Sequence, residues 1–277
     1  HQGIPLSFNN LADLDGALRV VFEYERPACA IIKHMNPAGC ATAETSVTAF
    51  ERALAGDPVS AYGGIVVFNR PVGPAEVRAI RSSRTFFEVL AAPGFVGDAL
   101  ARLAPREKLR VLELPADWAT SIPPGQDCRR VQGGWLLQDW DLGAEMTWNV
   151  ASKRAPSDDE ARALKFAWAA CRNVKSNAIV LAKADPDGES INGVGAGQMS
   201  RVDSVKLALS KATREVQGSV LASDAFFPFP DGIQVAVDAG VTAVIQPGGS
   251  IRDEAILEAA DAAGIAMVFT GCRHFRH

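Results

Sequence analysis

The chain has 277 residues, of which 48% are hydrophobic and 22% charged, and its formal net charge is −4. This length predicts one large or two ordinary domains with a substantial hydrophobic core. The acidic balance provides no positive field to hold nucleic acid or an anionic membrane, and no apolar run approaches the ~20 residues that span a bilayer. The first residues also lack the layout of a secretion signal. We therefore expect a soluble cytoplasmic protein that binds neither nucleic acid nor membrane.

The cysteines point to the same compartment. They are odd in number, widely spread and without a C-x-x-C pair, which favours reduced thiols over a disulfide framework or a zinc site. The five are Cys29, Cys40, Cys128, Cys171 and Cys272.

In the first half, helical and strand-like patterns alternate. The first helix is indicated by Leu14, Ala17, Leu18 and Val21, which fall on one helical face. In chain order we expect a helix (11–24), a strand (28–32), a helix (45–55), a strand (64–68), a helix opening with proline (74–80) and two strands (87–91 and 109–112).

The second half follows a polar, irregular segment at 141–157 and repeats the alternation. Ser157 and Glu160 form a capping box for a helix whose buried face we expect to hold Ala161, Leu164, Trp168 and Cys171. We then expect a strand (178–182), a turn (185–188), a helix (200–216), a strand (241–246), a helix (250–263) and a strand (265–269). This alternation predicts an α/β fold with a mostly parallel sheet covered on both faces, in two halves at 1–150 and 151–277.

Lys33 and His34 end the apolar run at 28–32 and precede Asn36, Pro37 and Gly39, which predict a turn. A cation and a titratable imidazole thus lie together at the end of a buried strand, where open α/β sheets bind ligands. A solvated pair is the alternative reading. The chain has only four histidines, and the stiff turn favours a chemical role.

Three loop-to-helix junctions are candidate anion sites: the NPAGC segment, the GVGAGQMSR segment ending at Arg201, and the PGGS segment at 247–250. Gln198 stands where a dinucleotide fingerprint needs glycine, and a phosphate-cradling lysine loop is absent from the sequence. The aromatic segment at 224–232 is either a buried corner or a wall for a flat ligand. The basic tail at 271–277 is either solvated or tied down by the strand before it.

Six segments occur in one order in a known family: KHMNPAGC, VKSNAIVLAK, GVGAGQMSR, SDAFFPFPDG, QPGGSIRD and RHFRH. From about residue 6 to the end, the chain resembles the AICAR transformylase domain of the bifunctional purine-biosynthesis proteins. The resemblance implies two cytidine deaminase-like halves, each a mixed sheet flanked by helices. It also implies a homodimer with shared active sites.

The implied reaction moves the formyl group of 10-formyltetrahydrofolate to the 5-amino group of AICAR and forms FAICAR. The acceptor amine is a poor nucleophile that must lose a proton, so a base is needed, and His34 is the natural one. Lys33 can stabilise the oxyanion and assist departure of the folate nitrogen. Asn177 matches the amide that lies near the substrate carboxamide and the catalytic centre.

The resemblance also assigns ligand contacts. Those to the nucleotide substrate fall on Gly63, Glu88, Arg201, Phe226 and Arg273. Those to the folate co-substrate fall on Val202, Asp231, Ser250 and Ile251. No catalytic metal is implied, and a structural monovalent cation is compatible with the family. The family's arginine-tyrosine segment and cyclohydrolase half would precede His1.

Three other functions compete with this one. A cytidine deaminase-like zinc hydrolase would need H-x-E and P-C-x-x-C, but Asn36 replaces the acid and only Cys40 follows. A catalytically inert nucleotide-binding module is the second. A formate- and ATP-driven formyltransferase is disfavoured, because the phosphate-cradling loop is missing.

Overall fold

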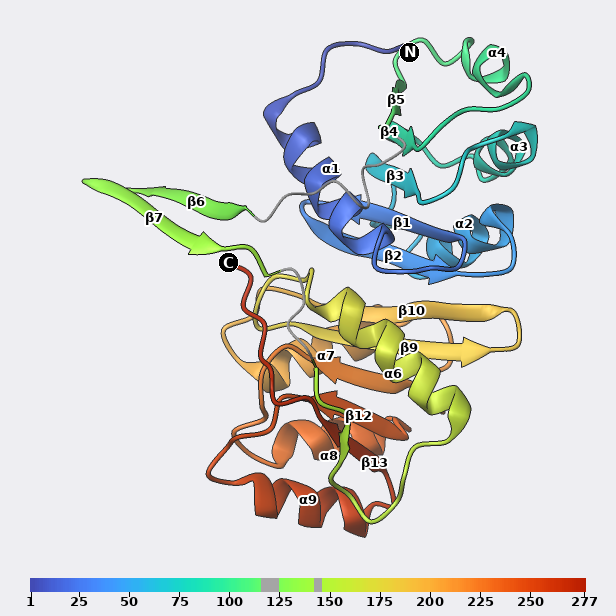
Figure 1. Ribbon diagram of the computed structural model, residues 1–277. Helices are drawn as coiled ribbons and strands as arrows, with labels where there is room; N and C mark the ends of the chain where they lie inside the picture. The colour runs from blue at the N-terminus through green and yellow to red at the C-terminus, as the bar shows by residue number, and fades with distance from the viewer. Residues whose placement is uncertain (116–124, 142–145) are drawn as a thin grey trace.

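One 11-stranded mixed sheet runs through the computed structural model, which describes residues 1–115, 125–141 and 146–277 (Figure 1). Its strand order is β5-β4-β3-β1-β2-β10-β9-β11-β12-β13-β8. The first half contains α1 (Phe8–Val21), β1 (Ala28–Lys33), β2 (Asn36–Thr42), α2 (Ser46–Leu54), β3 (Gly64–Phe68), α3 (Pro74–Ser82), β4 (Phe87–Ala92), α4 (Ala99–Leu103) and β5 (Arg110–Glu113).

The rest of the chain contains β6 (Gln126–Val131), β7 (Gly134–Asp139), β8 (Asn149–Val150), α6 (Asp158–Cys171), β9 (Ile179–Asp185), β10 (Gly188–Gly195), α7 (Arg201–Lys211), β11 (Val220–Ser223), α8 (Asp231–Asp238), β12 (Ala243–Gln246), α9 (Asp253–Ala262) and β13 (Ala266–Phe269). Within the described residues, no helix is long and apolar enough to cross a membrane.

The strands repeat one topology. In each half a hairpin (β1–β2 or β9–β10) is followed by an antiparallel neighbour of its first strand (β3 or β11) and by two parallel strands. The second hairpin strands, β2 and β10, meet antiparallel at the middle, with Ala41 opposite Ser190. Similarity of either half to the cytidine deaminases stays a prediction.

Helices cover both faces of the sheet, as predicted. Along β1, Ala28, Ala30 and Ile32 pack with α1 and α6 in one core, whereas Cys29 and Ile31 pack with α2, α3 and α4 in another. The third core lies under α7, α8 and α9. This alternation follows from the two-residue period of a strand.

Most predicted elements are confirmed with small shifts in their ends. The strand at 64–68 and the Ser157–Glu160 capping box appear as expected, and the β12–α9–β13 unit is parallel. The prediction of a mostly parallel sheet is wrong, because the strands of the hairpins and the strands beside them pair antiparallel. Ala161 is only partly buried, and Ala163 takes its place in the core.

Two glycine-rich segments lie wholly or partly in strands. NPAGC lies in β2, and GVGAGQMSR has Gly193 and Gly195 in β10, whereas its residues 196–200 form the predicted loop into α7. A Cβ on Gly39 would meet the Ala53 carbonyl oxygen at 1.8 Å, and one on Gly195 would meet the Ser204 carbonyl oxygen at 1.9 Å. These glycines therefore let α2 and α7 pack directly on the two central strands.

The β6–β7 hairpin projects from the body of the molecule (Figure 1), and we call it the arm. All of its strand residues are exposed. It precedes the irregular segment predicted at 141–157, of which residues 142–145 lie outside the described residues. Within that segment, β8 pairs with β13 at the end of the sheet.

Candidate functional site

The predicted site residues all lie along one edge of the sheet, which we call the site edge. Antiparallel neighbours run in opposite directions and parallel neighbours in the same one, so the ends of β1, β10, β11, β12 and β13 meet there with the starts of β3, β4 and β9. In the first half this edge carries Lys33, His34, Gly63 and Glu88; in the second half it carries Asn177, Arg201, Val202, Phe226, Asp231, Ser250, Ile251 and Arg273.

Lys33 ends β1, and its ammonium is held by backbone. Nζ donates to the carbonyl oxygens of Tyr62 and Gly63, both at 3.0 Å. Gly63 has φ +71°, and a Cβ there would approach Lys33 Nζ to 2.8 Å. A glycine at this position therefore leaves room for the lysine, which gives Gly63 a structural role in addition to its predicted contact with the nucleotide.

His34 follows at the tip of the β1–β2 hairpin. It is exposed and has φ +52°. The sequence prediction placed the turn on Asn36, Pro37 and Gly39, but the turn is made by His34 and Met35 instead. The imidazole thus belongs to one of the two residues that form the hairpin turn.

A cavity of about 280 Å³ opens beside the Lys33–His34 pair. Its wall includes β2, the α2–β3 loop, β10 and α7, so both halves contribute. Lys211 reaches across to Asp57 at 3.1 Å. Burial would raise the pKa of Asp57, but hydrogen bonds from Ser60 and Lys211 lower it below its usual range. Asn177 and Arg201 are not among the residues that line this cavity.

Asn177 and Arg201 belong to a polar cluster with Asp224, in which Arg201 and Asp224 are buried and Asn177 is partly buried. Arg201 Nη1 donates to Asp224 Oδ1 at 2.5 Å, and its Nη2 donates to Asn177 Oδ1 at 2.7 Å. Asn177 Nδ2 donates to the carbonyl oxygens of Gln198 and Met199. The Arg201 charge is therefore paired with Asp224 inside the protein, and a contact of Arg201 with the nucleotide stays a prediction.

Glu88 is also engaged. Its carboxylate accepts from Asn10 Nδ2 at 2.8 Å and lies 3.5 Å from Arg110 Nη1. Two neighbours thus fix the orientation of this predicted nucleotide contact.

The remaining predicted contacts occupy helix starts and loops. Asp231 begins α8, Val202 is the second residue of α7, and Phe226 is partly buried after β11. The PGGS turn has its amides occupied, because Gly249 and Ser250 both donate to the Asp253 carboxylate. An anion bound at this turn would therefore compete with the Asp253 carboxylate for these two amides.

Exposed apolar side chains on the same edge were missed by sequence reasoning. Beside the site these are Val59, Tyr62, Phe86, Met199 and Phe229, and the predicted contact Ile251 is fully exposed with them. The Tyr62 and Phe86 rings lie 5.6 Å apart. Large apolar groups left in solvent beside a polar site suit a flat organic ligand or a partner surface. The sequence did contain a signal for them, because each of these apolar residues lies in a loop next to a predicted strand or helix.

The C-terminal tail is tied down. His274 is buried, its Nδ1 lies 2.6 Å from Asp141 Oδ2, and its ring lies 4.9 Å from that of Trp168. Arg276 donates from Nη1 to the Asn173 carbonyl oxygen. Arg273 is exposed, with its guanidinium over Phe275. Of the two arginines in the tail, Arg273 is thus the one that is exposed and can meet an anion from solvent.

Metal ligation finds little support. Within the described residues, no three His, Cys, Asp or Glu side chains are grouped so that they could hold a metal ion. Burial raises the pKa of Cys40 to about 12, which disfavours the thiolate that a zinc ligand needs. All five cysteines are free.

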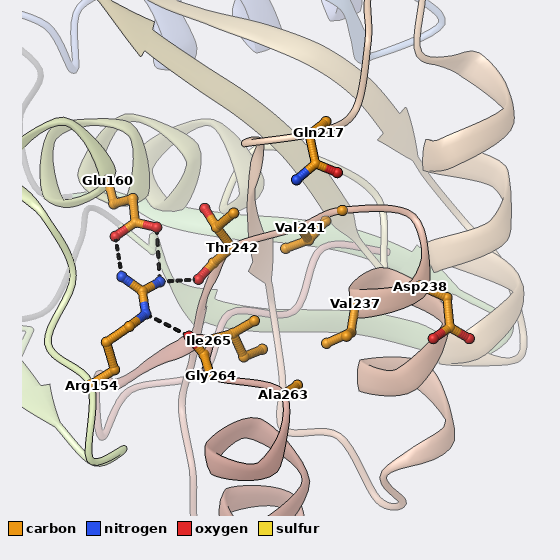
Figure 2. A pocket seen from close by; sticks show the side chains of 11 residues that line it. Arg154, Glu160, Gln217, Val237, Asp238, Val241, Thr242, Ala263, Gly264 and Ile265 are labelled. Carbon is orange, nitrogen blue, oxygen red and sulfur yellow. Dashed lines mark hydrogen bonds and ion pairs between the residues drawn. The ribbon is translucent and has the colours of Figure 1, made fainter.

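A larger cavity of about 390 Å³ lies at the opposite edge, at the starts of β12 and β13. Figure 2 shows the Arg154 guanidinium facing Glu160 there. Arg154 also donates to the carbonyl oxygens of Gly264 and Thr242. This arrangement ties loops together, and the ion pair has a structural role.

The Arg154–Glu160 pair predicts a pH effect on stability. Burial would raise the pKa of Glu160, but hydrogen bonds from Arg154, Thr242 and Ser157 lower it from 4.5 to about 2. Because the folded pKa is depressed, the stabilisation is present above pH 4.5 and lost as pH falls toward 2. We expect Glu160→Gln to flatten the fall of the urea midpoint in this window. Glu254→Gln, at an exposed position of α9, should retain the wild-type slope, and an unchanged slope in Glu160→Gln would contradict the assignment.

By its fold, the chain is an α/β protein with a helix-flanked mixed sheet and a cavity at one sheet edge. The chain belongs to the AICARFT/IMPCHase bienzyme family, whose model matches residues 1–211. Two curated relatives, each named bifunctional purine biosynthesis protein PurH, come from two strains of Desulfitobacterium hafniense. Each is 50% identical over 278 residues, covering 100% of this chain and 52% of the relative. The chain thus spans about half the length of these relatives, and the family predicted from the motifs is confirmed.

Proposed function

We propose that this chain carries the transformylase activity of its family in purine biosynthesis. It transfers the formyl group of 10-formyltetrahydrofolate to the 5-amino group of AICAR and yields FAICAR. The observation that carries the proposal is the Lys33–His34 pair on the site edge, beside a cavity to which both halves contribute. The family membership supports the choice of substrates.

His34 acts as the general base. The AICAR amine attacks the formyl carbon and gives its proton to the imidazole, the carbon–N10 bond of the folate breaks, and N10 leaves as an amine after taking a proton. An exposed imidazole at a hairpin tip can reach a ligand without rearrangement of the core. General acid–base catalysis of this kind contributes about 10²- to 10⁴-fold.

Lys33 stabilises the tetrahedral oxyanion. An ammonium has three N–H donors, and the carbonyl oxygens of Tyr62 and Gly63 accept two of them. The third donor remains for the developing negative charge. A preorganised donor of this type stabilises the transition state without reorganising during the reaction.

Ligand binding is assigned along the rest of the site edge. The nucleotide is held by Gly63, Glu88, Arg201, Phe226 and Arg273. Asn177, whose amide oxygen accepts from Arg201, acts at the catalytic centre. The folate is held by Val202, Asp231, Ser250 and Ile251, with exposed Tyr62 and Phe86 providing an apolar wall. A structural monovalent cation stays a proposal.

An assay of the purified chain tests the proposed function. The protein is mixed with AICAR and 10-formyltetrahydrofolate, and tetrahydrofolate release is followed by absorbance. We expect turnover that requires both substrates. A folded chain that binds AICAR in calorimetry but gives no turnover would be the inert module, and deamination of cytidine with zinc in the purified protein would identify the hydrolase.

We also propose that the chain forms a homodimer through the arm. Trp135, Leu136 and Leu137 on β7 are 63%, 58% and 60% exposed. An isolated two-stranded hairpin is marginally stable in water, so an apolar one needs a surface to cover it. A second copy of the chain supplies that surface in the proposed dimer.

Sedimentation tests the dimer. We expect the wild-type chain to sediment at twice its 29.4 kDa, and Leu136→Lys combined with Leu137→Lys to shift it to the monomer, because buried ammonium groups oppose association. Val96→Ser removes a comparably exposed side chain away from the arm and should leave the dimer intact. A double variant that stays dimeric would contradict a role for the arm.

A further inference from the structure

The turn that carries His34 has an unfavourable backbone. His34 and Met35 have φ values of +52° and +62°. Two-residue hairpin turns with positive φ at both central positions prefer Asn-Gly, Asp-Gly or Gly-Gly. A side chain other than glycine in this region costs free energy, which persists only where neighbours hold the conformation in place. The neighbours of this turn are therefore informative.

Asp13 on α1 holds both amides of the turn. Its Oδ1 accepts from the Met35 N–H at 2.7 Å, and its Oδ2 accepts from the His34 N–H at 3.3 Å. Each carboxylate oxygen thus serves one amide, and hydrogen bonds to an ionised acceptor are stronger than neutral ones. A single carboxylate spans the two residues with positive φ.

Asn36 holds the other side of the turn. Its Nδ2 donates to the His34 carbonyl oxygen at 3.0 Å, and its Oδ1 accepts from the Lys175 N–H at 3.0 Å. Both backbone polar groups of His34 are therefore bound by side chains. The second contact ties the turn to the segment that leads into Asn177, in the other half of the chain.

Helix α1 supports a second site residue one turn away. Asn10, three residues before Asp13, donates to the Glu88 carboxylate at 2.8 Å. Residues three apart lie on the same helical face. One face of α1 thus braces both the catalytic turn and a predicted nucleotide contact.

We infer that Asp13 is a positioning residue for His34, acting through the backbone of the turn. Its carboxylate holds the imidazole where the acceptor amine must lose its proton. The catalytic consequence rests on the proposed transformylase function, whereas the effect on the turn does not. A misplacement of about 1 Å can cost about 10²-fold in rate.

Two substitutions at Asp13 test the inference. Asp13→Ala removes both acceptors, whereas Asp13→Asn keeps one oxygen. We expect kcat to fall by up to about 10²-fold in Asp13→Ala and by less in Asp13→Asn, with the KM values for AICAR and the folate nearly unchanged. Asp15→Ala on the same helix removes only an exposed pair with Arg19 and should leave kcat unchanged.

A second readout does not depend on activity. Amide hydrogen exchange followed by NMR should show a protected Met35 N–H in the wild type and in Asp15→Ala, faster exchange in Asp13→Ala, and a shift of the His34 ring signals. Unchanged kcat together with an unchanged His34 signal in folded Asp13→Ala would overturn the inference, as would a loss confined to KM. If the wild-type chain shows no formyl transfer, the proposed function fails and this readout alone decides the positioning. Should Asp13→Ala not fold, Asp13→Asn provides the same comparison.

Discussion

Replacing His34 with alanine is expected to lower kcat for formyl transfer by about 10²- to 10⁴-fold. In the proposed mechanism the imidazole accepts the proton that the AICAR amine must lose, and no other histidine is on the wall of the cavity beside it. Because His34 is exposed, its removal should leave the fold intact. The measurement is steady-state tetrahydrofolate release, with circular dichroism to verify folding.

Lys33→Ala is expected to reduce kcat by a similar factor, since it removes the donor proposed to stabilise the oxyanion. Lys108→Ala replaces an exposed lysine in the loop that precedes β5, and it serves as the matched control, with wild-type rates expected. Near wild-type kcat in folded His34→Ala or Lys33→Ala would remove that residue from the mechanism.

The second large effect is on stability. Arg201→Met should lower the free energy of unfolding by about 3–5 kcal/mol, because it leaves the Asp224 carboxylate buried without its cation. The Arg201 and Asp224 side chains are only 8% and 1% exposed, so water cannot replace the lost partner. Urea unfolding measures the change.

Lys206→Met on the same helix provides the control. Lys206 makes an exposed pair with Asp203 at 4.0 Å, and its loss should change the free energy of unfolding by about 0–1 kcal/mol. Adding Asp224→Asn to Arg201→Met should recover part of the lost stability, because no unpaired charge then remains. Equal effects of Arg201→Met and Lys206→Met would show that the buried pair is not stabilising.

Predictions from the sequence were reliable for features that a single short stretch of chain determines. The cap formed by Ser157 and Glu160, the start of α3 at Pro74 and the buried strand at 64–68 all depend on neighbours within a few residues. The position of Lys33 at the end of a strand is of the same kind. The ligand roles of the site residues stay predictions.

Glycine-rich segments misled because their role depends on distant neighbours. The sequence suggested phosphate-binding loops at Gly39 and Gly193, but α2 and α7 lie directly against the strands that contain them. The residues around each glycine do not indicate its packing partner, which is a helical residue 14 or 15 positions later in the chain (Ala53 for Gly39 and Ala208 for Gly193). The pairing of Arg201 with Asp224 was not predicted for the same reason, since the two residues are 23 positions apart in the sequence.

The sequence by itself determined the family, the α/β class, most helices and strands, and the adjacency of Lys33 and His34, because these depend on residue order and local periodicity. Only the tertiary structure decided which charges are paired inside the protein, that α1 holds the turn that carries His34, and that residues from both halves meet on one edge. Those outcomes depend on strand direction and register, which bring together segments more than 100 residues apart in the chain. Hydrogen bonds such as that between Asn36 and Lys175 exist only once the sheet has formed.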